Sequence, residues 1–280
     1  AVLMVNATVL GGLVGFSIQK ASGSSDPRLL YPLLAVGAGI GLGSSLLITE
    51  EWDVTPADAW YLSAGMWWPT LAGHFLYAGR FSTLPEEDRW EFGLIGATMG
   101  LTLSTLGVSL RPMSEGGAWL AHSGGALGVV FGGLGEFMGR GSVHTTPFSG
   151  MGYGAGIGWL AAAAAATQWR PSPTRVLAVD IGAFVGGLGG AAVGSPLLFG
   201  TRDATKQRGW TAITGGAALA GGALGFAFGR ERGATPKTAW MVPTPEILGE
   251  SVIGDRRAPI VGLAWTGSLE ADGKPGNPVR

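Results

Sequence analysis

The chain repeats itself about every 58 residues, and this period limits its possible folds more than any other feature. One polar residue recurs near the start of each copy, at Asn6, Ser63, His122 and Asp180. A period of this length indicates stacked supersecondary units. We therefore expect one repeat domain over residues 1–238, followed by a different, extended polar tail over residues 239–280 with one strand-like piece at 260–265. This tail is expected either to lie on the array or be disordered, or to offer a strand to a partner sheet. The units are expected at approximately 1–57, 58–116, 117–174 and 175–238.

The composition indicates that these units lie in a membrane. Charged residues make up 13% of the chain, against about 25% in an ordinary soluble domain. Mean hydropathy is positive, at +0.33. Each unit contains two apolar stretches of nearly 20 residues, and a helix of about that length crosses a hydrocarbon core ~30 Å thick. The stretches cover 1–19, 29–49, 58–79, 90–110, 117–138, 147–169, 175–199 and 209–229. The predicted fold is an all-α membrane protein of four helical hairpins, with eight transmembrane helices.

Several helix starts can be read directly from the sequence. Thr55-Pro56, Ser172-Pro173 and Thr235-Pro236 each place a capping hydroxyl before a proline that fits the first helical turn. Asp58 adds a negative charge close to one of these starts, where the helix dipole favours it.

Glycines spaced four residues apart predict how the helices pack. In lipid, small residues on one helical face let two backbones approach closely enough for dispersion contacts. In water the same glycines would cost a helix about 1 kcal/mol each relative to alanine. We therefore predict glycine zippers. The packing positions are Gly124, Gly128, Gly132, Gly150, Gly154, Gly158, Gly182, Gly186, Gly190, Gly194, Gly221, Gly225 and Gly229, with a shorter pair at Gly96 and Gly100.

A transmembrane β-barrel is the alternative fold. Glycines also alternate with period two over residues 37–43 and 150–154, as residues do in membrane strands. Against a barrel, the apolar stretches are about twice the ~10 residues that a membrane strand needs. The alanine run 161–166 also favours a helix.

The four recurring polar residues have two interpretations. Asn6, Ser63, His122 and Asp180 could meet at one level and line a hydrated path, because ionisable residues at membrane depth often mark pathways or pair with one another. Alternatively, each lies in the first turns of its helix, close to the interface and to water. Trp67 and Trp68 stand in mid-segment and are expected to face lipid or a neighbouring subunit.

The sequence contains no strong pattern for catalysis, cofactor binding or nucleic-acid binding. Residues 150–155 fit the dinucleotide-binding pattern loosely, but their glycines belong to an expected helix and not to a strand–helix turn. His122, Ser123 and Asp180 contain the residue types of a hydrolase triad, but no nucleophile motif accompanies them. The three histidines lack metal-ligand spacing, and cysteine is absent. Net charge is −1 with scattered basic residues, which argues against nucleic acid as a partner. We expect no catalytic residues, no metal and no cofactor.

These features predict a non-enzymatic structural or scaffold subunit of an integral membrane assembly. Its partners would be the lipid bilayer and either other proteins, engaged through the tail, or further copies of itself. A pore or transport component that uses the recurring polar positions is the alternative. We expect a bacterial cell envelope, with inner and outer membrane both open. Residue 1 is either a processed N-terminus or a fragment boundary.

Overall fold

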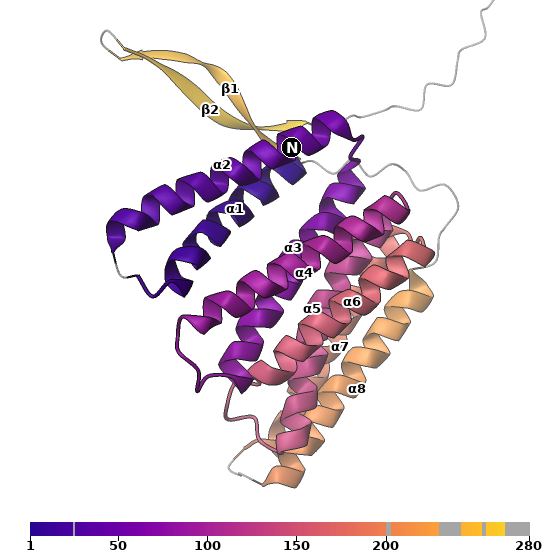
Figure 1. Cartoon of the computed structure of the whole chain (residues 1–280). Helices are drawn as coiled ribbons and strands as arrows, with labels where there is room; N and C mark the ends of the chain where they lie inside the picture. Colours follow the sequence, from indigo (N-terminus) through magenta and orange to yellow (C-terminus); the bar gives the residue numbers. More distant parts are fainter. Residues whose placement is uncertain (25, 200–202, 230–241, 254–255, 267–280) are drawn as a thin grey trace, which may run out of the picture. The chain divides into compact units, whose positions relative to one another are not determined.

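In the computed structural model the described residues are 1–24, 26–199, 203–229, 242–253 and 256–266. Within them the chain forms eight α-helices (Figure 1). Their bounds are α1 Val2–Ala21, α2 Pro27–Glu51, α3 Pro56–Arg80, α4 Asp88–Leu110, α5 Glu115–Arg140, α6 Phe148–Gln168, α7 Pro173–Gly194 and α8 Ala204–Phe228. A short 3₁₀ helix, η1, follows α7 at Ser195–Leu197. Each predicted apolar stretch corresponds to one of the eight α-helices.

Two of the three predicted helix starts are confirmed. Thr55 caps α3 in a capping box, in which its side chain and that of Asp58 each accept from the other residue's backbone N–H. Ser172 caps α7, with its hydroxyl accepting from the N–H of Arg175. The third predicted start, Thr235-Pro236, lies outside the described residues.

Consecutive helices pack most extensively in the pairs α1–α2, α3–α4, α5–α6 and α7–α8. In each pair the helices are antiparallel and meet at small residues four positions apart. In the third pair, Gly124, Gly128 and Gly132 of α5 face Gly158, Gly154 and Gly150 of α6, in that order. Four-residue spacing keeps the glycines on one face of each helix, so the two backbones touch over several turns.

The barrel alternative is wrong for these segments, because they are helices. The alternating glycines of residues 37–43 lie in α2 and those of 150–154 lie in α6. Residues two apart in a helix point in nearly opposite directions. Accordingly, Gly37 and Gly41 face the backbone of α1, whereas a Cβ built on Gly39 or Gly43 would meet no atom within 4 Å.

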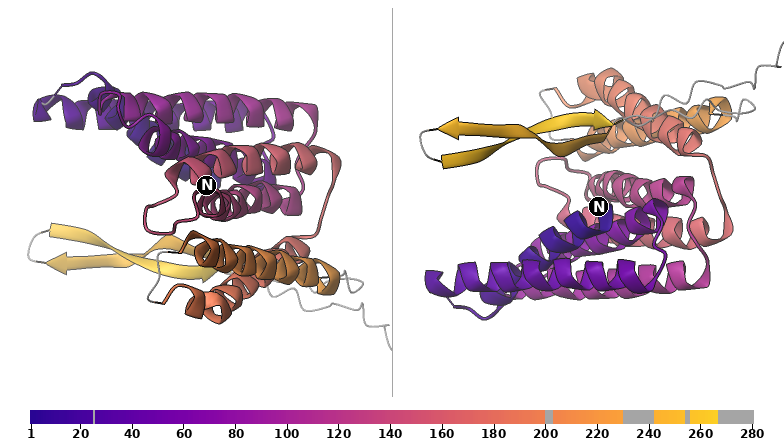
Figure 2. Two further views of the ribbon diagram at one scale, coloured as in Figure 1. Left: turned by 90° about the horizontal axis from the view of Figure 1, so that it is seen from below. Right: turned by 90° about the horizontal axis from the view of Figure 1, so that it is seen from above.

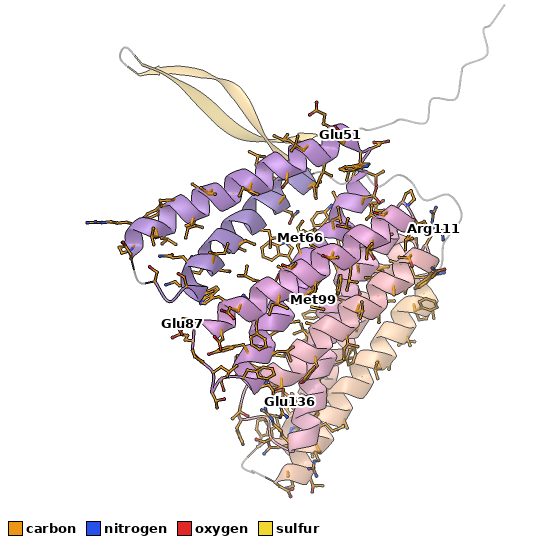
Figure 3. The ribbon with its side chains drawn as sticks, viewed as in Figure 1. Glu51, Met66, Glu87, Met99, Arg111 and Glu136 are labelled. Atoms are coloured by element: carbon orange, nitrogen blue, oxygen red, sulfur yellow. The ribbon has the colours of Figure 1, made fainter. Side chains whose placement is uncertain are left out.

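Five helices are long and apolar enough to cross a membrane: α1, α2, α4, α7 and α8. The charged side chains labelled in Figure 3 lie towards the two ends of the helices, with Glu51 and Arg111 at one end and Glu87 and Glu136 at the other. Met66 and Met99 lie between them. This distribution, together with the apolar helices, is compatible with an integral membrane protein in contact with a lipid bilayer.

The pairs follow one another in sequence order. Each odd-numbered helix contacts both helices of the next pair: α1 contacts α3 and α4, α3 contacts α5 and α6, and α5 contacts α7 and α8. In Figure 2, α5 and α6 lie between the first four helices and the α7–α8 pair. The odd-numbered helices therefore form a continuous row that connects the pairs.

Residues beyond the helices belong to a second compact unit, Glu231–Arg280. It contains an antiparallel β-hairpin of strands β1, Val242–Ile253, and β2, Arg256–Thr266, with an irregularity in register between Ile247 and Gly249. The strand-like piece expected at residues 260–265 lies within β2 and pairs with β1 of the same chain. The rest of the predicted tail, including residues 267–280, lies outside the described residues.

Candidate functional site

The small-residue contacts leave no room for larger side chains inside the helix pairs. A Cβ built on Gly128 would collide with the backbone carbonyl oxygen of Gly154, and one on Gly182 with that of Gly221. Of the predicted packing positions, Gly194 instead faces the ring of Trp210, and Gly229 lies near Ala178 and Arg175. The others face the backbone or an alanine methyl of the partner helix. Equivalent contacts not included in the predicted set occur at Gly11, Gly15, Gly65 and Gly73.

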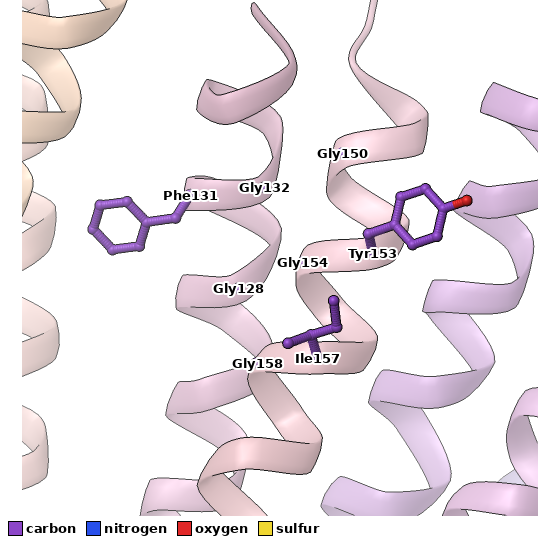
Figure 4. Close-up of a pocket in the computed structure, with 8 residues that line it drawn as sticks. All are labelled: Gly128, Phe131, Gly132, Gly150, Tyr153, Gly154, Ile157 and Gly158. Carbon is purple, nitrogen blue, oxygen red and sulfur yellow. The ribbon is translucent and has the colours of Figure 1, made fainter. Parts of the chain in front are cut away.

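The outer side of the α5–α6 contact is an open apolar groove (Figure 4). Its floor is glycine from both helices, and Phe131, Tyr153 and Ile157 stand at its edges. Tyr153 and Ile157 are exposed. The groove exists because the glycines that let the backbones touch place no side chains over the contact. Hydrocarbon chains of lipid match such a surface in polarity.

The first recurring polar residue, Asn6, connects α1 to α3. Its Oδ1 accepts a hydrogen bond from Oγ of Ser63 and another from Nε1 of Trp67, each 3.1 Å long. Its Nδ2 donates to the carbonyl oxygen of Val2, at 3.1 Å. The structure thus brings together two of the four predicted positions, and Ser63 is fully buried between the helices.

His122 connects α5 to α3. Trp68 donates through Nε1 to Nδ1 of His122, at 3.3 Å, and Nε2 of His122 lies 3.1 Å from the carbonyl oxygen of Trp60. A ring that accepts at Nδ1 and donates at Nε2 is the neutral tautomer. Both ring nitrogens are therefore used in binding the neighbouring helix.

Asp180 connects α7 to α5. Its Oδ1 accepts a hydrogen bond from the hydroxyl of Ser123, the residue that follows His122. His122 and Ser123 thus point to different helices, one to α3 and the other to α7. This separation removes the geometry of a hydrolase triad, because no base lies between the hydroxyl and the carboxylate.

The four recurring polar residues form three separate links between successive odd-numbered helices, α1–α3, α3–α5 and α5–α7. The expectation that Trp67 and Trp68 face lipid or a neighbouring subunit is wrong, because both indoles donate into these links. An indole N–H within a bundle needs an acceptor, and polar side chains on the adjacent helix supply it. These hydrogen bonds therefore serve to join neighbouring odd-numbered helices.

Replacing His122 with leucine is expected to lower the free energy of unfolding by about 1 kcal/mol, the usual contribution of an interhelical hydrogen bond in a membrane protein. The indole of Trp68 and the carbonyl of Trp60 would lose their partner. The matched control is His144→Leu, at an exposed position in the α5–α6 loop, which should change stability little. Denaturation in mixed detergent micelles would measure both, and equal effects would contradict this role of His122.

Two further buried polar side chains fix loops to helices. Asp58 of α3 accepts from the backbone N–H of Met113, at 2.8 Å, and Gln207 of α8 accepts from that of Val143, also at 2.8 Å. Their side chains are 3% and 1% exposed. The sequence indicates only that Asp58 lies favourably near a helix start, and it gives no signal for Gln207. Both loop contacts join residues more than 50 positions apart.

Within the described ranges, no group of three or more histidine, aspartate or glutamate residues is placed to hold a metal ion. Comparisons of the chain with protein-family models, with curated proteins and with solved structures give no match. The arguments for function therefore come from the chain's own residues.

Proposed function

We propose that the protein is a non-enzymatic structural subunit of a membrane assembly in a bacterial cell envelope. Its four helix pairs would be repeated units, each closed by a glycine zipper, and all eight helices would cross the bilayer. The units would form a rigid membrane-embedded platform, and the C-terminal unit, Glu231–Arg280, would engage other proteins.

The links between odd-numbered helices are the observation that carries this proposal. A transport path needs polar groups that face water or a solute. Here the recurring polar residues are hydrogen-bonded to neighbouring helices. Asn6 bonds to Ser63 and Trp67, and His122 bonds to Trp60 and Trp68. Side chains used in this way stabilise a bundle.

The α3, α5 and α6 helices fall outside the set of five candidate membrane spans, but their lengths and contacts support a spanning role. Each is 21 residues or longer. Each packs along a partner or neighbour of similar length, and α3 and α5 form the middle of the row of odd-numbered helices. In α3, 12 of 25 residues are buried, so this helix needs less apolar surface than a helix that faces lipid on most sides.

A pore or transport component is the second candidate. The observation that favours it is that His122 and Asp180, two ionisable residues, lie in the row of odd-numbered helices between α3 and α7. Intramembrane ionisable residues often belong to a proton or ion pathway.

Liposome flux separates the two functions. We expect purified protein to give no ion or small-solute flux above that of protein-free vesicles, and the double variant His122→Leu/Asp180→Leu to give the same background. Flux that requires these two residues would overturn the scaffold proposal in favour of a pore. Mass spectrometry of the purified protein for bound organic cofactors would test the non-enzymatic assignment in the same preparation.

The tail can be tested separately by deleting residues 241–280. Under the scaffold proposal, proteins that co-purify with the full chain from native membranes are lost from the shortened chain, while its helix content by circular dichroism is unchanged. Co-purification that is unaffected by the deletion would contradict a partner-binding role for this segment.

A further inference from the structure

The helix pairs bind one another in one direction along the chain, so the two ends of the row of pairs expose different helix faces. Each odd-numbered helix contacts the pair that follows it, and in the described residues neither α1 nor α2 contacts α7 or α8. The row of pairs is therefore open. Among the described helices, the α7–α8 pair binds no further pair through α7, and no other pair binds the α1–α2 pair through α2.

The face that α3 uses to bind the next pair is a stripe along one side of the helix. Trp68 on this face donates to His122 of α5, and Phe75 packs on Phe148 of α6 with ring centroids 6.1 Å apart. Ala64, one turn before Trp68, is fully buried.

The same stripe recurs on α5, 59 residues further along the chain. There Ser123 donates to Asp180 of α7, and Leu134 lies 3.8 Å from a Cβ built on Gly215 of α8. Two successive odd-numbered helices thus bind the following pair through the same positions.

On α7 the equivalent positions, 58 residues after those of α5, are exposed. We call them the α7 stripe; its residues are Ile181, Val185 and Ala192. Ile181 and Val185 are 54% and 61% exposed. Within the described helices, no pair covers this face of α7, which is the face that α3 and α5 each use to bind the pair after them.

The other end exposes the complementary face. On α6, Gly152 and Gly156 lie against Leu76 and Ala72 of the preceding pair; a Cβ on Gly156 would be 3.6 Å from that of Ala72. Together with Phe148, these two glycines form the face by which α6 is held.

The corresponding residues of α2, 117 positions earlier, are Tyr31, Ala35 and Gly39, which we call the α2 stripe. All three are exposed, Tyr31 to 73%, and a Cβ on Gly39 would meet nothing within 4 Å. On α4 the residue equivalent to Tyr31 is Trp90, which packs on Phe16 of α1 with ring centroids 4.9 Å apart. On α2 the face is therefore exposed that α4 and α6 each use to contact the preceding helix pair.

We propose that a second copy of this chain docks head to tail, with the α2 stripe of one copy on the α7 stripe of the other. The contact continues an interface that the chain already makes three times between its own helix pairs. Because the two faces differ, the contact is heterologous and produces rings or filaments. This inference goes beyond the proposed function and does not depend on it.

Cysteine cross-linking tests the contact in the full chain, which has no native cysteine. Tyr31→Cys and Ala192→Cys are introduced into separate chains, which are mixed in liposomes and oxidised. We expect a cross-linked dimer from the mixture and only background from either variant alone; the double variant should give a ladder of higher species. The matched control pairs Tyr31→Cys with Ile95→Cys, at an exposed position on α4. Cross-linking of Tyr31→Cys to itself, or no more cross-linking than in the control, would overturn the proposal.

A second variant leaves the chain's own contacts intact. Gly39→Leu has room inside one copy but fills the α2 stripe. We expect single-molecule photobleaching to detect oligomers of the unmodified protein and to find Gly39→Leu folded but monomeric. Gly216→Leu, on α8, also has open space around it and should keep the oligomers. Oligomers that persist in Gly39→Leu, or an unmodified protein that stays monomeric at high protein-to-lipid ratio, would contradict head-to-tail docking. A failed cross-link with no solute flux would leave the scaffold function standing, which separates the two proposals.

Discussion

Replacing Gly128 with leucine is expected to force α5 and α6 apart and to lower the free energy of unfolding by about 3 kcal/mol, the upper part of the usual range for overpacking. The new side chain would collide with the carbonyl oxygen of Gly154 and with the Cα of Gly158. Both are backbone atoms of α6, so no rotation of a side chain relieves the clash. Unfolding by sodium dodecyl sulfate in mixed micelles, followed by circular dichroism, would measure the loss.

Gly135 provides a matched control on the same helix. A Cβ at this position meets nothing within 4 Å. Leucine also has the higher helix propensity, by up to about 1 kcal/mol relative to glycine. Gly135→Leu should therefore leave the protein as stable as the parent or slightly more stable. If the two variants behaved alike, the contact between α5 and α6 would not depend on the absence of a side chain at Gly128.

The positions of the helices could be predicted because they depend on local signals. The length of an apolar stretch is read within one segment, and a capping residue acts on the turn that follows it. In the structure α3 begins directly after Thr55 and α7 directly after Ser172. Glycines four apart were visible in α5–α8 for the same reason. In α2 the signal was obscured, because Gly39 and Gly43 on the opposite face turn a four-residue period into an apparent two-residue one.

The partners of the polar residues could not be predicted from local sequence. Asn6 and Ser63 are both small polar residues near helix starts, and nothing near either in sequence shows that they bond to each other. That pairing depends on how α1 and α3 are rotated about their axes, which packing across several helices determines. The indoles of Trp67 and Trp68 show the same dependence: their polarity suits an interface with headgroups as well as it suits an acceptor on the adjacent helix.

The second large effect is expected at Asp58, where replacement by alanine should lower the free energy of unfolding by about 3 kcal/mol, because buried donors would be left without an acceptor. One carboxylate oxygen accepts from the backbone N–H and the hydroxyl of Thr55, at 3.1 and 2.6 Å. The other accepts from the backbone N–H of Met113, at 2.8 Å. The side chain therefore caps α3 and also holds the loop between α4 and α5. The start of the second helix pair is thereby tied to the start of the third.

Asp26 provides a variant that tests the capping role alone. Among the described residues its carboxylate caps α2 and makes no hydrogen bond to a distant loop. Its exposed carboxylate accepts from the backbone N–H of Arg28 at 2.9 Å, so Asp26→Ala should cost about 1 kcal/mol, as the loss of an exposed N-cap does. Hydrogen exchange gives a local readout: the Met113 amide should lose protection in Asp58→Ala and keep it in Asp26→Ala. Asp58→Asn should recover part of the protection, since an amide oxygen can still accept from Met113. If Met113 exchanged at the same rate in all three variants, Asp58 would act only as a cap, and the third pair would be positioned by apolar and glycine contacts alone.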